Sequence, residues 1–187
     1  MSNLIPKNES SEPPKPWMAS EEIAAIEKLL EPDDRMLEFG SGRSTLWLSS
    51  LVKEIHSIEH NASWAAEVSS AAASNVHVHC REPEFAHVGF TPAKPGQFES
   101  YLAVPDELQI EFDVALIDGR ARIEAAVNVA PCLRSGGWLF FHDWYNRERY
   151  YTRQNELTPY YTLVDELSIT ETPQTLAIFR RTPEQVS

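Results

Sequence analysis

The chain has 187 residues, 42% hydrophobic and 24% charged, which is typical of one soluble domain with its own core. Its 16 basic and 28 acidic residues give a formal net charge of −12. Nucleic acids and anionic membranes attract clustered positive charge, so we expect neither as a partner. The two cysteines, Cys80 and Cys132, are too few for a disulfide framework, and we interpret them as reduced thiols of a cytoplasmic protein.

The first residues differ in composition from the rest of the chain. Residues 1–16 are polar and rich in proline, which predicts a disordered N-terminal tail that ends where Trp17 and Met18 could dock. One domain is expected over residues 17–187. Within it, patterns typical of helices and strands alternate. Helices are predicted over residues 20–30, 44–52 and 121–133 and after Asn61, and strands over residues 35–39, 54–59, 75–80, 112–118 and 138–142.

The C-terminal part of the chain departs from this alternation. Residues 160–167 and 175–180 predict two strands joined by a loop containing Pro173, and hence an antiparallel hairpin. Together the elements predict an α/β fold, a doubly wound and mostly parallel seven-stranded sheet closed by that hairpin. Residues 81–109 are rich in proline and receive no assignment.

Polar residues and glycines gather where the predicted parallel strands end. In open α/β sheets, ligands bind beyond these carboxyl ends. The first strand ends in Glu38 and Phe39 and continues into Gly40-Ser41-Gly42, whose glycines allow a tight turn beside a helix N-terminus. Glu59 ends the second strand, where a carboxylate can accept both hydrogen bonds of a ribose diol. Asp118-Gly119 and His142-Asp143 end two further strands.

Two cofactor classes suit a glycine loop of this kind. A dinucleotide fold prefers a third glycine at the position that Thr45 occupies here. The carboxylate of Glu38 would repel a pyrophosphate, whereas it could pair with a cationic group such as a sulfonium. The residues therefore favour a cationic cofactor over a nicotinamide dinucleotide.

Four segments resemble the motifs of the class I S-adenosylmethionine-dependent methyltransferases. They are residues 37–42 (LEFGSG), 57–60 (SIEH), 112–119 (FDVALIDG) and 134–141 (RSGGWLFF). The resemblance covers residues 35–180 and implies a Rossmann-like methyltransferase fold with S-adenosylmethionine as cofactor. The cofactor-binding residues that it implies are Glu38, Phe39, Gly40, Ser41, Gly42, Ser44, Thr45, Glu59, His60 and Asp118.

The resemblance extends distantly to metal-dependent O-methyltransferases of the catechol and macrocin types. In these, acids at the ends of strands four and five bind a divalent cation, and Asp118 and Asp143 match two of those positions. Trp144 stands where a third oxygen ligand is often found, and Arg120 adds a cation nearby, so we favour a site without metal. His142 is then the predicted general base, oriented by Asp143 or Asp118, and these three are the predicted catalytic residues.

A segment rich in tyrosine and arginine follows. Residues 144–161 hold five of the six tyrosines, interleaved with Arg147, Arg149 and Arg153. They predict an acceptor site for an anionic or aromatic small molecule, with Arg120, Trp144 and Arg147 as substrate contacts. The expected reaction is methyl transfer to a hydroxyl, carboxyl or amine. The alternatives are a non-catalytic, cofactor-binding regulatory protein and a nicotinamide-dependent oxidoreductase.

Structural roles compete with several of these functional roles. Asp118 and Asp143 could each cap a following helix, and His142 could be a structural hydrogen-bonding residue. Trp47 and Trp64 are most simply core residues. The histidines at 56, 77, 79 and 87 are too scattered to suggest a metal cluster. The tail and the aromatic segment would suit a homodimer.

Overall fold

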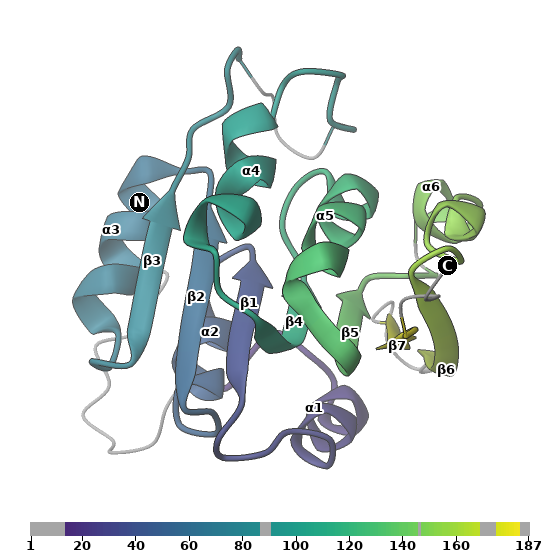
Figure 1. Cartoon of the computed structure of the whole chain (residues 1–187). Coiled ribbons are helices and arrows are strands. Elements are labelled where there is room, and N and C mark those ends of the chain that lie inside the picture. The colour runs from purple at the N-terminus through teal and green to yellow at the C-terminus, as the bar shows by residue number, and fades with distance from the viewer. Residues whose placement is uncertain (1–13, 87–90, 146, 169–174, 184–187) are drawn as a thin grey trace.

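Seven strands form one sheet in the order β3-β2-β1-β4-β5-β7-β6 in the computed structural model (Figure 1). The structure describes residues 14–86, 91–145, 147–168 and 175–183, so most of the predicted tail, and Pro173, lie outside the described residues. The strands are β1 (Arg35–Phe39), β2 (Glu54–Glu59), β3 (Val76–Cys80), β4 (Phe112–Ile117), β5 (Leu133–His142), β6 (Tyr161–Ser168) and β7 (Thr175–Arg181).

The first five strands are parallel to one another, and β7 pairs antiparallel with both β5 and β6. The predicted doubly wound sheet with a C-terminal antiparallel hairpin is therefore confirmed. The strand order reverses between β1 and β4, and in open α/β sheets a ligand-binding crevice lies outside the carboxyl ends of the strands at this point.

Helices cover both faces of the sheet. They are α1 (Ser20–Glu27), α2 (Arg43–Leu48), α3 (Ala62–Ala71), α4 (Glu99–Leu108), α5 (Arg122–Val129) and α6 (Glu148–Tyr151), with 3₁₀ turns at Ala130–Cys132 and Gln154–Glu156. Ile26 of α1 and Trp47 of α2 belong to one core cluster, whereas Tyr101 of α4 and Ile123 of α5 belong to the cluster on the opposite face. None of the described helices is long and apolar enough to cross a membrane.

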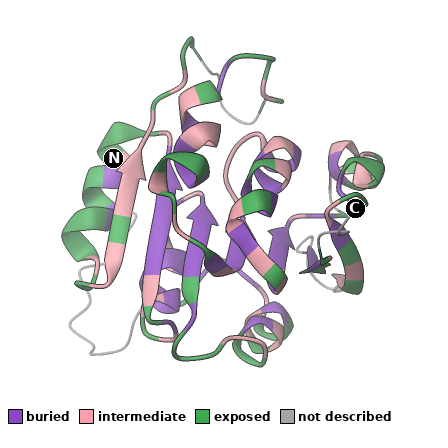
Figure 2. Cartoon of the chain, in the orientation of Figure 1, coloured by how far each residue is buried: buried purple, intermediate pink, exposed green. Residues whose placement is uncertain are grey.

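The central strands β1 and β4 are largely buried (Figure 2), and burial on both faces explains the nearly continuous apolar sequence of β4. In β4, five of the six residues are fully buried. Ahead of α1, Met18 packs into one of the two core clusters, while the neighbouring Trp17 remains 62% exposed. The side chain of Met18 therefore fixes the chain where the described domain begins.

Two boundaries differ from the sequence prediction. Strand β5 begins at Leu133 and includes Gly136 and Gly137, which were expected to precede a strand starting at residue 138. A Cβ atom on Gly137 would lie 2.7 Å from the carbonyl oxygen of Asp113, and the β4–β5 register shifts at this point. The glycines thus serve a bulge within a strand. The helix expected up to residue 133 ends at Val129 and continues as a 3₁₀ turn.

Helix α4 lies within residues 81–109, the segment that received no prediction. Pro105 falls inside it, and a proline in a helix interior removes a backbone hydrogen bond. The helix persists because Tyr101, Val104 and Pro105 are buried against the sheet. Tertiary packing here overrides a weak local preference.

Candidate active site

A cavity of about 730 Å³ lies at the carboxyl ends of the parallel strands. Its walls come from the loops after β1, β2 and β4, from α6 and its neighbouring segments, and from Trp17 and Met18. The volume is in the range of pockets that hold a cofactor together with a small substrate. The charged residues that line it are Arg43, Glu59, Glu67, Asp118, Arg120, Arg122, Glu124, Arg147, Arg149 and Arg153, together with His60.

Glu38 secures the glycine loop from beneath and does not line the cavity. Its fully buried carboxylate accepts hydrogen bonds from the hydroxyls of Ser44 (2.6 Å), Thr45 (2.5 Å) and Ser57 (2.5 Å). Burial raises the pKa of Glu38 to about 7, although the three hydroxyl donors act in the opposite direction. Its observed partners are hydroxyls that join β1, α2 and β2, not a cationic group.

Gly40 and Gly119 hold two loops in direct contact. Gly40 has a φ of +99°, and a Cβ atom on it would lie 2.7 Å from the backbone of Gly119. A Cβ atom on Gly119 would lie 2.1 Å from the hydroxyl oxygen of Tyr101 in α4. Only glycine fits both positions, so the loops after β1 and β4 can meet at the floor of the cavity.

Glu59, predicted to bind a ribose, is buried at the end of β2 and lines the cavity. Its carboxylate accepts hydrogen bonds from the backbone N–H groups of Ser41 (3.2 Å), His60 (2.9 Å) and Asn61 (2.8 Å). These donors orient a negative charge at the cavity wall. Ser41, Gly42 and His60, three further predicted cofactor residues, line the same wall.

Two residues of this wall were not predicted from the sequence to belong to the site. Trp64, interpreted as core, lines the cavity and donates from its indole N–H to the carbonyl of Ser41 at 2.6 Å. Arg43 also lines it, and its buried Nε has no hydrogen-bond partner among the described residues. Arg43 begins α2 directly after Gly42. A cation at a helix N-terminus is unfavourable because it opposes the helix dipole. An arginine at the start of a predicted helix was therefore the signal in the sequence that could have pointed to a role in binding.

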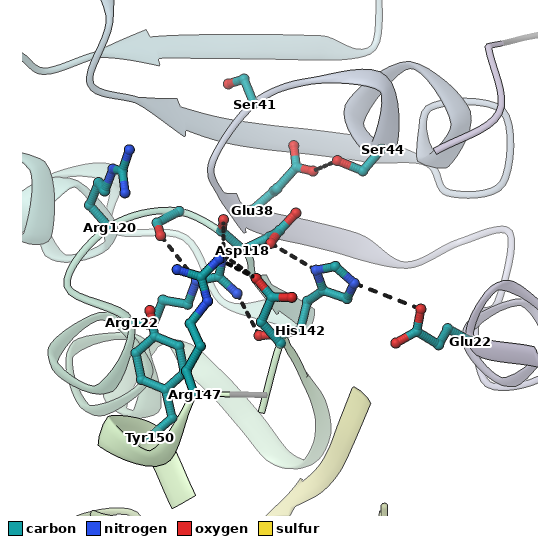
Figure 3. Close-up of polar contacts among 12 residues, drawn as sticks. Glu22, Glu38, Ser41, Ser44, Asp118, Arg120, Arg122, His142, Arg147 and Tyr150 are labelled. Atoms are coloured by element: carbon teal, nitrogen blue, oxygen red, sulfur yellow. Dashed lines mark hydrogen bonds and ion pairs between the residues drawn. The ribbon is translucent and has the colours of Figure 1, made fainter. Parts of the chain in front are cut away.

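The ends of β4 and β5 hold a cluster of ion pairs (Figure 3). Arg122 forms ion pairs with the carboxylates of Asp118 at 2.9 Å and Asp143 at 3.3 Å. Arg147 contacts the same Asp143 carboxylate at 3.0 Å, and His142 Nδ1 lies 3.0 Å from Asp118 Oδ1. The three predicted catalytic residues are therefore neighbours, and Arg122, which the sequence prediction omitted, links them.

Glu22 approaches this cluster from α1 and was also missed. Its buried carboxylate lies 3.7 Å from His142 Nε2, which is an ion-pair distance but too long for a hydrogen bond. Burial alone would lower the pKa of His142, but the carboxylates of Asp118, Glu22 and Asp143 raise it to about 10. Burial raises the pKa of Asp118, but His142 and Arg122 bring it below its usual value.

These charges oppose the predicted role of His142 as a general base. An imidazolium has no lone pair with which to accept a proton. His142 also lies behind Asp118 and does not line the cavity. Asp118 and Asp143 do not cap the following helices, because the N-caps of α5 and α6 are Ala121 and Arg147.

Trp144 was predicted to contact the substrate, but the structure places it in the core. It is fully buried, packs against the rings of Phe141 and Phe179, and donates from its indole N–H to Glu166 at 3.1 Å. Trp144 is therefore a core residue and does not line the cavity. Phe39 and Thr45, predicted near the cofactor, are fully buried as well and lie beneath the loop.

The predicted tyrosine–arginine segment does reach the cavity. The guanidinium of Arg149 lies 4.9 Å from the centre of the Tyr150 ring and donates to its hydroxyl at 3.1 Å. Arg153 pairs with Glu124 at 2.9 Å and with Glu156 at 2.6 Å. Arg120 lines the cavity too, and burial lowers its pKa.

Comparison with protein families shows which family this chain belongs to. A family model described as a methyltransferase domain matches residues 37–144, more than half of the chain. The chain belongs to this methyltransferase family. The match extends from the glycine loop to the residue after Asp143, so both loops that meet at Gly40 and Gly119 lie inside it. The protein is a methyltransferase that uses S-adenosylmethionine, as the sequence motifs predicted.

Solved structures share the fold of this methyltransferase. A methyltransferase-like protein from Silicibacter pomeroyi is 24% identical, with a TM-score of 0.65 over 93% of this chain and 91% of that one. Fibrillarin pre-rRNA processing protein from Methanococcus jannaschii is 14% identical (TM-score 0.61, 83% and 70% covered).

N-methyltransferase NodS from Bradyrhizobium japonicum, solved with S-adenosyl-L-homocysteine, is 15% identical (TM-score 0.55, 86% and 85% covered). No curated protein matches the chain. At these identities the likeness concerns the fold, and the acceptor has to be argued from the cavity of this chain.

Proposed function

We propose that this methyltransferase transfers the methyl group of S-adenosylmethionine to an anionic oxygen of a small molecule, either a carboxylate or an acidic hydroxyl. The observation that carries the proposal is the charge of the cavity. Six arginines line it, against four acids. This local excess of positive charge contrasts with the net charge of −12 of the whole chain. A cationic amine would be repelled by such a wall, whereas an anion would be attracted.

The residues around Gly40 fit the cofactor. Gly40, Ser41 and Gly42 form a loop beside the first turn of α2, Glu59 would accept the ribose hydroxyls, and Arg43 would pair with a carboxylate through its unpartnered Nε. When bound, the cofactor supplies a methyl group made electrophilic by the adjacent sulfonium.

A divalent metal at Asp118 and Asp143 does not fit the observed contacts. Ligand atoms of Asp118, His142 and Asp143 lie within 4.8 Å of one another, as a metal would require. However, Arg122 already contacts both carboxylates, and Arg147 contacts one of them. The cationic charge between the acids is thus supplied by the protein. We propose a reaction without metal, in which this cluster fixes the ends of β4 and β5.

The arginines also relieve the need for a strong base. A positive wall stabilises the ionised form of an acceptor hydroxyl and lowers its pKa, and a carboxylate is already ionised at neutral pH. The remaining requirement is that the nucleophilic oxygen and the methyl group meet in line, which the cavity walls would provide. A protonated His142 is compatible with this mechanism.

Arg149 is the proposed anchor of the acceptor. It lines the cavity, its contacts are with the ring and hydroxyl of Tyr150, and it forms no ion pair with a carboxylate among the described residues. Arg122, Arg147 and Arg153 are each paired with acids. An arginine held against an aromatic ring can present its guanidinium to a carboxylate in bidentate fashion.

The test compares phenols that differ in the charge of the para substituent. Transfer of tritiated methyl from S-adenosylmethionine is measured to phenol, to 4-hydroxybenzoate and to 4-hydroxybenzylamine. We expect kcat/KM to be about tenfold or more higher for the carboxylate-bearing phenol, because one charge-assisted hydrogen bond contributes roughly 1.5–3 kcal/mol. Arg149→Gln should remove that preference, whereas Arg134→Gln, on the far end of β5, should preserve it. Preference for the neutral phenol or the amine would overturn the proposal.

A cofactor titration separates acceptor effects from cofactor effects. Calorimetric titration with S-adenosylhomocysteine should give the same affinity for wild type and Arg149→Gln. Glu59→Gln should weaken binding by about tenfold or more, since it removes a charged acceptor from the ribose position. Glu67→Gln, another acid of the cavity wall, is the matched control and should bind as wild type does. Unchanged affinity in Glu59→Gln would refute the ribose assignment.

A further inference from the structure

A second cluster of chemically active side chains lies on β2 and β3, away from the cavity. Glu54 and His56 alternate along β2, and His77 and His79 alternate along β3, so all four share one face of the sheet. His56 is paired in register with His77. Glu54 begins β2, whereas the cavity residue Glu59 ends it. The expectation that these histidines are too scattered to form a cluster is therefore wrong for the three that the structure describes.

The ligand atoms of three of these residues converge. Glu54 Oε1 lies 3.3 Å from His56 Nε2 and 3.2 Å from His77 Nε2, and each of the three residues offers a ligand atom within 4.8 Å of the other two. Zinc binds imidazole nitrogen and carboxylate oxygen at about 2.0–2.2 Å, so two tetrahedral ligands of one ion lie roughly 3.3–3.5 Å apart. The two distances from Glu54 match this spacing.

The surroundings orient these ligands. His56 Nδ1 lies 3.0 Å from His79 Nε2, and the two ring planes differ by only 8° with their centres 5.2 Å apart, so the rings meet edge to edge. If His56 donates its Nδ1 proton to His79, its Nε2 lone pair points toward Glu54 and His77. Metal-binding histidines are commonly held in this way through their other ring nitrogen.

The neighbouring charges leave the site open to a cation. Arg35 lies 3.4 Å from Oε2 of Glu54 and leaves Oε1 facing the imidazoles. Arg81, which follows β3, pairs with Glu107 at 2.9 Å. This differs from the Asp118 and Asp143 cluster, where a guanidinium contacts both carboxylates. The side chain of His77 is 47% exposed, so solvent can reach the point where the three ligand atoms meet.

We propose that Glu54, His56 and His77 form a zinc site, with water as the fourth ligand and His79 as a positioning residue. Two imidazoles and one carboxylate form a ligand set that favours binding of zinc. Magnesium and calcium prefer sites made of oxygen ligands alone. The ion would join β3, the edge strand, to β2, and would contribute to the stability of the fold independently of methyl transfer.

Calorimetric titration with zinc chloride tests the site, using chelator-treated protein without a polyhistidine tag. We expect one zinc ion per chain at sub-micromolar Kd, together with a rise in Tm. Glu54→Gln and His77→Ala should each weaken binding tenfold or more. Asp118→Asn, which alters the other cluster, should bind zinc as wild type does. Metal-free Tm values close to wild type would show that Glu54→Gln and His77→Ala fold. Asp118→Asn removes a partner of Arg122 and should have a lower Tm, so a far-UV circular dichroism spectrum like that of wild type is its test of folding.

Three results would overturn the proposal: no zinc binding by wild type, unchanged binding in His77→Ala, or loss of binding in Asp118→Asn in place of Glu54→Gln. The positioning role of His79 has its own test. His79→Ala should weaken zinc binding about tenfold. His79→Gln should restore it, since the amide oxygen can accept the same hydrogen bond from His56. Equal affinities for the two variants would refute the positioning role.

Discussion

Asp118 and its neighbours show how a buried set of charges can be held by the ends of two strands. The guanidinium of Arg122 donates to the backbone carbonyls of Asp118 (2.8 Å), Gly119 (3.1 Å) and His142 (2.5 Å) as well as contacting two carboxylates. A buried charge is tolerated when its donors are satisfied in this way, and removing one partner is costly. The cluster therefore fixes β4 against β5 directly beneath the cavity.

The raised pKa of His142 makes the stability of the protein depend on pH. Because the folded-state pKa is about 10 and the unfolded value is about 6.5, the stabilisation is complete below pH 6.5 and is lost as pH rises toward 10. The free energy of unfolding should fall by at most about 1.4 kcal/mol per pH unit in this window. Urea unfolding at intervals from pH 6.5 to 10 measures this slope.

His142→Gln is the comparison that isolates the imidazolium, because tyrosine, lysine and cysteine also titrate in this window. The variant should be less stable than wild type at pH 6.5 and should lose less stability as pH rises. Parallel curves for the two proteins would show that His142 is not charged in the folded state.

At the scale of elements, the cavity floor depends on three segments far apart in the sequence. The loop after β1 contributes Gly40, the loop after β4 contributes Gly119, and α4 contributes Tyr101, whose ring is fully buried. The hydroxyl of Tyr101 accepts a hydrogen bond from the backbone N–H of Arg120 at 3.4 Å. Helix α4 thus supports the site, although its residues do not line the cavity.

Gly119→Ala tests this support. The added methyl would lie 2.1 Å from Tyr101 Oη and 2.9 Å from the nitrogen of Gly40, so the loops must separate. Overpacking of this kind costs about 1–3 kcal/mol, and we expect a lower Tm and weaker binding of S-adenosylhomocysteine. Tyr101→Phe removes the nearest clashing atom, so the double variant should recover part of the lost stability. Additive losses in the double variant would contradict the contact.

How far the sequence predicted these elements depended on whether a local pattern existed. The strand predicted over residues 112–118 is present as β4 (Phe112–Ile117), because a strand buried on both faces has a nearly continuous apolar sequence. Helix α4 carried a proline and lacked a comparable signature. The ion pairs of Arg122 and the approach of Glu22 to His142 depend on contacts between distant segments, which no local pattern records.

At the scale of the whole molecule, charge is distributed unevenly. The chain carries −12 overall, yet the cavity is lined by more arginines than acids. A negative exterior repels polyanions, whereas a recessed positive wall is accessible to a small anion that can enter the cavity. The same fold occurs in a pre-rRNA processing protein, but a shared fold does not fix the substrate.

We therefore expect the protein not to bind RNA. Fluorescence anisotropy of a labelled RNA hairpin should stay unchanged up to about 10 µM protein at physiological salt, because binding to a phosphate backbone requires several clustered cations that release counterions. Lowering the salt concentration should not produce binding, since weaker screening strengthens repulsion by the acidic surface. Saturable binding that weakens steeply with added salt would contradict this expectation. If Arg149→Gln also weakened that binding, the cavity arginines would be its source, and the acceptor would have to be sought among nucleic acids.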